Sequence, residues 1–596
     1  MQYPTLLEYM KAIQDAGNNL DKLSHLSVVL DGHGEPYHIS GDSSVVFKMQ
    51  DKTTGKCYAL KCFTKAQKGC ADASSNSSSM KYLEKELLVL SQGKEEKYPV
   101  ELMDWLDDDS LGASQLKVED MSTEATKAEL NEAITDEFSV KYSKDGRKLL
   151  KVPQKLKGTY AIKEGTKIIC DRAFEDCKSL RSLVIPNSVT SIRESAFSFC
   201  SSLKSIVLPD GITSIGDETF FGCSSLASLV IPDGVTSIGN GAFAYCGSLK
   251  NLVLPESVVS IKGNLFCKWN GEVKCLSPNF IFEDGVLFNK GKSTIISFRD
   301  KDITSYVIPD YVTSIGGDAF SGCESLTSLV IPDSVVSIGD GAFSHCESLK
   351  NIVLPNSITS IGFCVFQHCR SLKSLVIPDS VTSIDTLAFC FCSSLKSLVI
   401  PGGVTSIEKM AFSGCKSLKS IVIPDGVTSI GSGAFSGCES LKSIVIPDSV
   451  TCIGNRAFEY CFSLKSLVLS KSLTSIGDWA FNMAESLESL VIPDSVTSIG
   501  DYAFSGCRSL KSLVISNSVT HIAMGAFLSC TSLSSVVIPD GVTSIGEGAF
   551  IGCESLKSIV LPDGVVSIEK DAFRDCNFPN DFKQKLISRF GDKIFG

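Results

Sequence analysis

Hydrophobic and polar positions recur along most of the chain in a unit of 23 residues. Residues 417–438, SLKSIVIPDGVTSIGSGAFSGC, are a representative copy, and the consensus is S-L-K-S-[LI]-V-[IL]-P-D-[SG]-V-T-S-I-G-x-x-A-F-x-x-C. A fixed period of roughly 20–50 residues is the sequence signature of a solenoid. The pattern therefore predicts coils that stack on one another, not elements that surround one compact core.

A phenylalanine near the end of each unit marks the period. Successive members are 23 residues apart, except for the step from Phe266 to Phe320, which is 54 residues. Residues 280–320 repeat the order of features found in residues 138–174: a glycine turn, an apolar strand, a Tyr-x-Ile and a final Ala-Phe. We therefore expect an irregular long coil at 267–319 with an added hairpin. The full set is Phe174, Phe197, Phe220, Phe243, Phe266, Phe320, Phe343, Phe366, Phe389, Phe412, Phe435, Phe458, Phe481, Phe504, Phe527, Phe550 and Phe573.

The first half of each unit predicts a strand followed by a turn. Ile421 and Ile423 are two residues apart, so both side chains face the interior, while Ser420 and Val422 face outward. Pro424 ends the strand, and the Asp-Gly pair that follows it turns the chain.

The second half of each unit predicts a second short strand and one helical turn. Val427 and Ile430 are buried on the strand, and Gly431 is expected to take a positive φ. Phe435 and Cys438 are three residues apart, so one helical turn would place both side chains inward. Because parallel strands stack at roughly 4.8 Å, roughly 18 or 19 coils would make a rod on the order of 90 Å long.

The unit resembles the BspA-type leucine-rich repeat, whose pattern is L-x-x-[IL]-x-[IL]-P-x-x-V-x-x-I-G-x-x-A-F-x-x-C. The resemblance covers residues 138–576 and includes the long coil. It implies an α/β fold class, a right-handed leucine-rich-repeat solenoid of 23-residue coils with a parallel β-sheet. It also implies an interaction role, and relatives of this type are often cell-surface or host-contact proteins.

The segments on either side of the repeats are expected to be helical. Residues 577–596 have apolar residues at positions 582, 586, 590 and 594, which predicts an amphipathic helix, opened by Pro579 and Asn580, that caps the final coil. Residues 113–137 are polar and predict a helical linker from about Ser122, where no capping box is present.

Residues 1–112 predict a small α+β domain. A helix is expected at about Leu6–Ala16, and alternating residues predict a β-hairpin at about Ser43–Phe63.

This N-terminal domain resembles a truncated, degenerate protein-kinase N-lobe. Gly41-x-x-x-x-Val46 is similar to the glycine-rich loop, Y-A-L-K ending at Lys61 is similar to the strand that carries the nucleotide lysine, and residues 98–112 resemble the fifth strand and hinge. The resemblance implies an ATP site in which Gly41 approaches the phosphates, Lys61 pairs with them, and Val46 and Met103 complete the pocket.

The parts that phosphoryl transfer requires are missing from the sequence. None of the six histidines begins an H-R-D, and no D-F-G occurs. The stretch where this resemblance needs a helix, residues 70–90, is rich in Ser and Asn, and Glu84 and Glu86 are the nearest partners for Lys61. We therefore expect no enzymatic activity and no cofactor, with Lys61 as an ordinary exposed lysine on a strand.

Charge and composition limit the partners and the location. A net charge of -11 argues against nucleic acid and against an anionic membrane surface. The first residues lack a basic segment followed by an apolar one, and no run approaches about 18 apolar residues, so we expect no signal peptide and no membrane insertion. The sequence thus predicts a cytoplasmic, monomeric protein with reduced cysteines. A missed start site or a non-standard export route would place it at the cell surface.

Two polar positions that recur in most units resemble metal-binding sites but have simpler explanations. Most units end in a cysteine, such as Cys438, and a small buried thiol suits a packed core. Aspartates follow the proline, as at Asp425, but Asn187 and Asn356 replace them, which is typical of a turn and not of a calcium ligand. We expect no metal site.

The outward strand positions are the strongest candidates for function. An exposed apolar stripe of this length usually marks a binding face, and aromatic residues are favoured as binding hot spots. Trp269 and Phe363 are further irregular aromatic residues, and we expect them to contact a partner as well. The residues proposed to contact a partner are Val376, Val399, Val422, Val445, Val468, Lys396, Lys419, Lys442, Tyr460, Trp479, Tyr502 and His521.

Three functions remain open at this point. The first is a non-enzymatic scaffold that binds a protein or a glycan along the solenoid, inside the cell or as an adhesin-like surface protein. The second is a nucleotide-responsive pseudokinase sensor that uses Lys61. The third is a kinase subunit completed by another chain.

Overall fold

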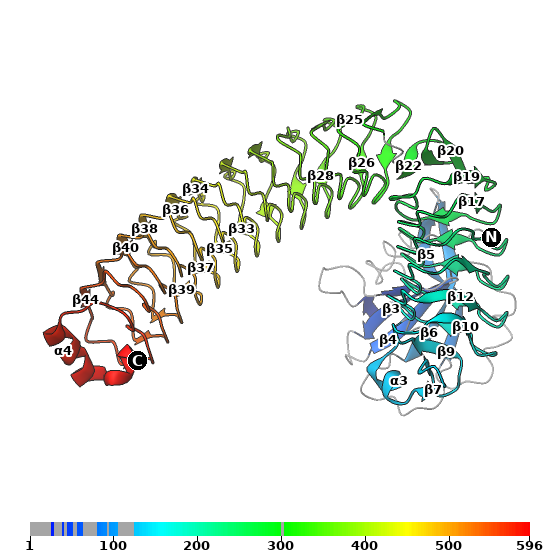
Figure 1. Cartoon of the computed structure of the whole chain (residues 1–596). Coiled ribbons are helices and arrows are strands. Elements are labelled where there is room, and N and C mark those ends of the chain that lie inside the picture. The colour runs from blue at the N-terminus through cyan, green and yellow to red at the C-terminus, as the bar shows by residue number, and fades with distance from the viewer. Residues whose placement is uncertain are drawn as a thin grey trace. The chain divides into compact units, whose positions relative to one another are not determined.

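The computed structural model describes residues 26–28, 38–40, 44–51, 57–63, 80–91, 94–104, 124–299 and 303–596. The chain divides into two units, residues 1–121 and 122–596. The second unit is a β-solenoid of about 18 turns with parallel sheets and little helix, in which the coils follow one another in chain order (Figure 1).

The described part of the first unit is a single sheet. Its order is β1-β3-β4-β6-β5, and β2 also pairs with β3. β3 and β4 are antiparallel with Val46 opposite Lys61, so the predicted hairpin is confirmed. The helix expected at about Leu6–Ala16 lies outside the described residues. The strands are β1 Leu26–Val28, β2 His38–Ser40, β3 Ser44–Asp51, β4 Cys57–Phe63, β5 Met80–Ser91 and β6 Lys94–Asp104.

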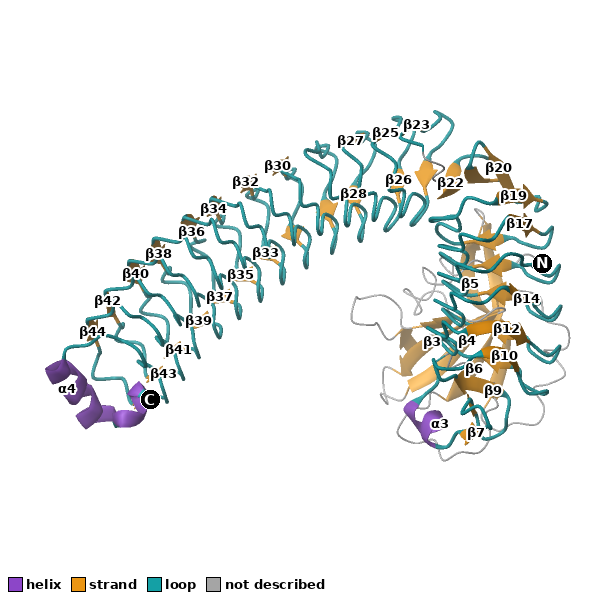
Figure 2. Ribbon diagram, viewed as in Figure 1, coloured by secondary structure: helices purple, strands orange, loops and turns teal. Residues whose placement is uncertain are grey.

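Most regular coils of the second unit contribute two short strands, which form two separate ladders (Figure 2). Ser228 and Ser374 take part in the first ladder only through isolated bridges. The first ladder contains the Ser-[Leu/Ile]-Val strands. Its members are β10 Gly158–Ala161, β12 Leu180–Val184, β14 Ser205–Ile206, β17 Asn251–Leu254, β19 Glu272–Cys275, β23 Ser305–Val307, β25 Ser328–Val330, β27 Asn351–Val353, β30 Ser397–Val399, β32 Ser420–Val422, β34 Ser443–Val445, β36 Ser466–Val468, β38 Ser489–Val491, β40 Ser512–Val514, β42 Ser535–Val537 and β44 Ser558–Val560.

The second ladder contains the Ser-Ile strands of the regular coils, preceded by β7, β8 and β9, which pair antiparallel with one another. Its members are β7 Ile134–Thr135, β8 Lys141–Tyr142, β9 Lys148–Lys151, β11 Ile168–Ile169, β13 Ser191–Ile192, β15 Ser214–Ile215, β16 Ser237–Ile238, β18 Ser260–Ile261, β22 Thr294–Phe298, β24 Ser314–Ile315, β26 Ser337–Ile338, β28 Ser360–Ile361, β29 Ser383–Ile384, β31 Ser406–Ile407, β33 Ser429–Ile430, β35 Cys452–Ile453, β37 Ser475–Ile476, β39 Ser498–Ile499, β41 His521–Ile522, β43 Ser544–Ile545 and β45 Ser567–Ile568.

The register of both ladders follows the sequence period. In the first ladder Ser397 pairs with Ser420 and Val399 with Val422, one unit apart. In the second ladder Ser406 pairs with Ser429 in the same parallel register. Because a side chain repeats its direction in every coil, each position in the unit becomes a column along the solenoid.

The segment between the second ladder and the next coil, which we call the turn segment, contains no helical turn. The Phe435 amide donates to the carbonyl of Ala457 in the next coil at 2.7 Å, and the Cys438 amide donates to the Phe435 carbonyl at 3.2 Å. Amides that bond to the neighbouring coil are not available for the bonds of an α-helix. The predicted helical turn is therefore wrong, and the fold class is a β-solenoid, not α/β.

Gly431 is not a positive-φ residue, which corrects the prediction. A side chain there would place its Cβ 2.7 Å from the backbone nitrogen of Lys409 and 2.9 Å from the carbonyl carbon of Glu408. The position is thus glycine because successive coils approach closely. The left-handed residues of this coil are Gly433 and Gly437, with φ of 64° and 71°.

Phenylalanine rings contact one another along the interior in two runs, from Phe174 to Phe243 and from Phe298 to Phe573, and the long coil separates them. The Phe435 ring is fully buried, with its centroid 5.3 Å from that of Phe412 and 5.2 Å from that of Phe458. The long coil also supplies a ring that the spacing did not reveal, because Phe298 stacks on Phe320 at 4.7 Å. The predicted hairpin of the long coil is confirmed as β20 Phe280–Glu283 and β21 Val286–Asn289, which pair antiparallel.

The cysteine column has a second role beside packing. Cys438 Sγ donates to the Phe412 carbonyl of the preceding coil at 3.4 Å, and Cys461 repeats this bond to Phe435 at 3.4 Å. Burial raises the pKa of Cys461 to about 12, so its thiol stays protonated at neutral pH. Each thiol thus satisfies a carbonyl between two coils.

The rate of thiol alkylation should distinguish the buried cysteines of this column from more exposed cysteines. Cys452 replaces the serine of a second-ladder strand and is half-buried, whereas Cys438 is fully buried. With iodoacetamide under native conditions we expect Cys452 to react at least about 100-fold faster than Cys438, because the buried thiol reacts only when its coil opens. Peptide mass spectrometry over a time course measures both rates. Equal rates would show that the thiol column is open to solvent.

Short helices lie at both ends of the solenoid. α3 Lys127–Asn131 begins later than the expected Ser122, and it does have a capping box, in which Thr126 and Glu129 exchange hydrogen bonds. α4 Asn580–Phe590 is followed by the 3₁₀ helix η2 Asp592–Phe595, so the predicted C-terminal helix ends before residue 594. Leu586 and Ile594 are buried in the same core as the last coils.

Candidate functional site

The outward valines of the first ladder form what we call the valine row, which is interrupted at the long coil, where Lys274 lies opposite Val253. Val422 is 70% exposed, while its neighbour Ile421 in the same strand is 7% exposed. The alternation of a strand thus places an apolar side chain in solvent once per coil. The row consists of Val184, Val207, Val230, Val253, Val307, Val330, Val353, Val376, Val399, Val422, Val445, Val468, Val491, Val514, Val537 and Val560.

Six exposed lysines, one per coil, run beside the valine row and form what we call the lysine row. Within the described solenoid only Lys465 of this set has an ion pair, to Glu488 at 3.1 Å. Like charges on neighbouring strands repel one another. This edge therefore offers positive potential to an acidic group. The six are Lys350, Lys373, Lys396, Lys419, Lys442 and Lys465.

Two cavities open beside the valine row, between β36 and β38. The larger, of about 580 Å³, is lined by Leu467, Val468 and Val491 among others, and the second, of about 550 Å³, shares Leu467 with it. This coil has Ser470 and Lys471 in place of the usual Pro-Asp pair. That replacement is the sequence signal of the irregularity, and sequence reasoning missed it.

The proposed contact residues do not all lie on one face. The valine row contains five of them, Val376, Val399, Val422, Val445 and Val468. The lysine row contains three, Lys396, Lys419 and Lys442. Tyr460, Trp479 and Tyr502 belong to turn segments, and His521 belongs to second-ladder strand β41. The structure therefore brings the valines and lysines together and leaves the aromatic residues and His521 apart from them.

The turn-segment rings mainly contact one another. Trp479 and Tyr502 stack at 4.3 Å, and the Arg456 guanidinium lies over Trp479 at 5.8 Å. A Cβ at Gly525 would collide with the Tyr502 ring, so this glycine makes room for it. Trp269 is a buried core residue whose Nε1 donates to the Leu249 carbonyl at 2.7 Å, so its assignment as a contact residue is wrong.

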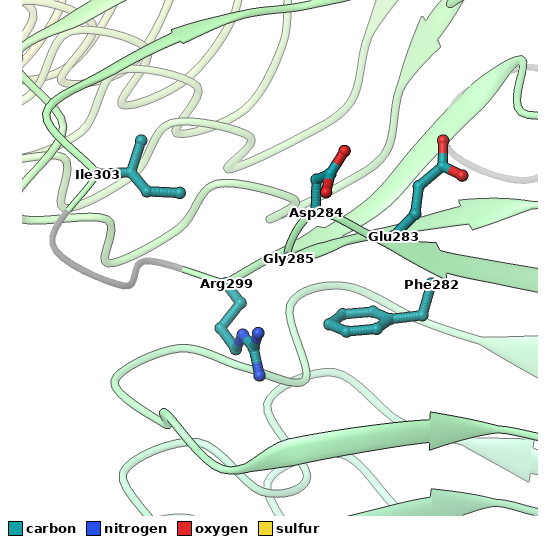
Figure 3. Close-up of a pocket in the computed structure, with 6 residues that line it drawn as sticks. All are labelled: Phe282, Glu283, Asp284, Gly285, Arg299 and Ile303. Atoms are coloured by element: carbon teal, nitrogen blue, oxygen red, sulfur yellow. The ribbon is translucent and has the colours of Figure 1, made fainter.

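A separate pocket of about 340 Å³ lies at the tip of the long-coil hairpin. Arg299 lies over the Phe282 ring at 5.2 Å, while the Glu283 and Asp284 side chains point away from both (Figure 3). The Glu283 carboxylate is instead paired with Lys292 at 2.6 Å. Burial lowers the pKa of Arg299, which donates to the Gly271 carbonyl.

The described residues offer no constellation for catalysis with a metal. No group of three or more His, Cys, Asp or Glu side chains among them could hold a metal ion. No helix within the described ranges is long and apolar enough to cross a membrane.

The repeats match a known family profile. The family profile described as BspA type Leucine rich repeat region (6 copies) matches residues 158–271, 295–419, 405–534 and 480–596. A leucine-rich repeat protein from Bacteroides ovatus is 30% identical over 53% of this chain and 96% of its own, with a TM-score of 0.39. No curated protein matches the chain.

Two further solved structures are similar over about half of the chain. A leucine rich cell surface protein from Faecalibacterium prausnitzii is 35% identical over 45% of this chain and 73% of its own, with a TM-score of 0.39. The pneumococcal vaccine antigen PcpA is 25% identical over 56% of this chain and 84% of its own, with a TM-score of 0.38.

The comparisons give the kinase-like resemblance of the N-terminal segment no support. Residues 80–91, part of the stretch where a kinase N-lobe would carry a helix, form strand β5. Val46, Lys61 and Met103 lie on β3, β4 and β6, and Gly41 lies outside the described residues. The ATP site that this resemblance implies is therefore not supported.

Proposed function

Because the chain belongs to the BspA-type leucine-rich repeat family, we propose that it is a non-enzymatic scaffold that binds a protein partner along the valine row. The observation that carries the proposal is the continuity of that row through the successive coils from Val307 to Val560. Exposed apolar surface of this extent is unusual on a protein without a partner. The lysine row beside it favours a partner with an acidic edge.

A protein fits this surface better than a glycan. The row is aliphatic, and a glycan would lose the hydrogen bonds of its hydroxyls there. The cavity at Leu467 and Val468 can in addition accept one larger side chain of a partner. A scaffold inside the cell and an adhesin-like protein outside it would use the same face, so fractionation of source cells distinguishes the two locations.

Charge placed in the valine row should abolish partner binding. In the variant Val399→Glu/Val422→Glu/Val445→Glu we expect the amount of partner captured from a source-cell lysate to fall at least about tenfold, because each carboxylate would be desolvated in the interface. Quantitative mass spectrometry of the bound fraction measures the loss. Replacement of the same three valines by serine keeps the surface uncharged, so we expect a smaller loss of captured partner.

The matched control places the same change on the other ladder. Val336 and Val566 precede second-ladder strands and are 58% and 79% exposed. Val336→Glu/Val566→Glu should capture the partner as the unmodified chain does. Equal loss in both variants, or no loss in the first with unchanged melting, would contradict binding at the valine row.

A further inference from the structure

The long coil leaves a notch in the row of turn segments. The coils of Phe266 and Phe320 each have a turn segment, but the ring between them, Phe298, ends strand β22 without one. The two turn segments are instead joined by side chains. Asn264 Nδ2 donates to the Ser321 carbonyl at 3.1 Å, and Lys268 pairs with Glu324 at 2.6 Å.

The notch is a cavity of about 350 Å³ with rings among its walls. Tyr245 lines it and contacts the Phe221 ring in a tilted arrangement, with the ring centroids 4.9 Å apart. His345 also lines it and stacks on His368 at 4.4 Å. Two groups of contacting rings thus reach the same cavity. Gly241 and Ala244 also line the cavity, and the Cys267 thiol occupies the space that a side chain at Gly322 would take.

Carboxylates supply the charge of the notch. Glu218 accepts from Ser195 Oγ at 3.2 Å, and Asp318 accepts from Asn240 Nδ2 at 2.8 Å, so both are held in place by neutral donors. In the described part of the chain neither forms an ion pair. Burial raises the pKa of Asp318, and the neighbouring carboxylates, including Asp340 and Asp217, raise it further. A bound cation would relieve this concentration of negative charge.

We propose that the notch binds an arginine side chain of a protein partner. A guanidinium is planar and presents several N–H donors, so it can bond to carboxylates and stack on a ring at the same time. Tyr245 and His345 provide the rings, and Glu218 and Asp318 provide the acceptors. This site is separate from the valine row and does not depend on the function proposed for that row.

Titration of the full-length chain with N-acetyl-arginine amide, followed by saturation-transfer NMR, tests the site. We expect saturable binding that weakens at least about tenfold in Glu218→Gln/Asp318→Asn, since both acceptors lose their charge. Asn suits the positive φ of residue 318, which is 53°. N-acetyl-citrulline amide and N-acetyl-lysine amide should bind about tenfold more weakly than the arginine probe.

Two further variants test whether the effect is specific to the notch. Asp425→Asn/Asp448→Asn removes the same charge from exposed turns and should bind as the unmodified chain does. Tyr245→Leu removes a ring from a partly exposed position and should weaken binding about threefold or more. Absence of saturable binding, equal binding of citrulline or lysine, or equal loss in the control variant would overturn the proposal.

Discussion

Phe435→Ala is expected to lower the free energy of unfolding by about 3–5 kcal/mol. The ring is fully buried and lies between the Phe412 and Phe458 rings at 5.3 and 5.2 Å. Strand pairing on two ladders fixes the spacing of the coils, so the neighbouring rings cannot move together to fill the cavity. The loss should therefore lie in the upper part of the range for large-to-small core substitutions.

Urea denaturation measures the loss of unfolding free energy, and hydrogen exchange shows which coils lose protection. Because a solenoid is stabilised by contacts between neighbouring coils, exchange should accelerate first in peptides that cover residues 412–458. Phe391→Ala is the matched control, since that ring is 40% exposed and stacks only at the surface, on His368. We expect a loss of about 1 kcal/mol there. Equal losses would mean that the buried column is not the main source of stability.

Gly431→Ala is expected to destabilise the solenoid by about 1–3 kcal/mol, although alanine is otherwise favourable in a folded chain. The added Cβ would lie 2.7 Å from the nitrogen of Lys409 and 2.9 Å from the carbonyl carbon of Glu408. Both atoms are backbone, so relief requires the two coils to separate and their ladder bonds to lengthen.

Gly402→Ala is the control for this substitution. No atom lies within 4 Å of a Cβ at Gly402, and its φ is not in the left-handed region. We expect a gain of about 0.4–1 kcal/mol, because alanine restricts the unfolded chain. Thermal and urea unfolding of the two variants in parallel should show changes of opposite sign. A neutral Gly431→Ala would show that the coils do not approach as closely as described.

The sequence predicts most positions of the regular coil correctly. Ile421 inward and Val422 outward follow from the two-residue period of a strand, and the stacking follows from the repeat itself. The buried column of Phe435 follows in the same way. These predictions succeed because an inward position must be apolar in every coil.

The remaining features depend on contacts between coils, which one unit of sequence does not contain. The sequence predicts that Gly431 is needed for its own backbone conformation, whereas in the structure the backbone of the preceding coil excludes a side chain there. Phe298 was missed because the hairpin displaces it from the period. The proposed contact residues share a face only in part, because Trp269, Tyr460 and Trp479 stand out by residue type but lie away from the valine row.

Lysine acetylation footprinting of the full chain, with and without the captured partner, tests the central claim most directly. We predict that Lys396, Lys419 and Lys442 are protected at least about tenfold in the complex, because the partner covers the lysine row together with the valines. Lys409 and Lys262, which are exposed and lie outside the first ladder, should be acetylated at unchanged rates. Protection of Lys409 and Lys262 with no change at the lysine row would contradict the account.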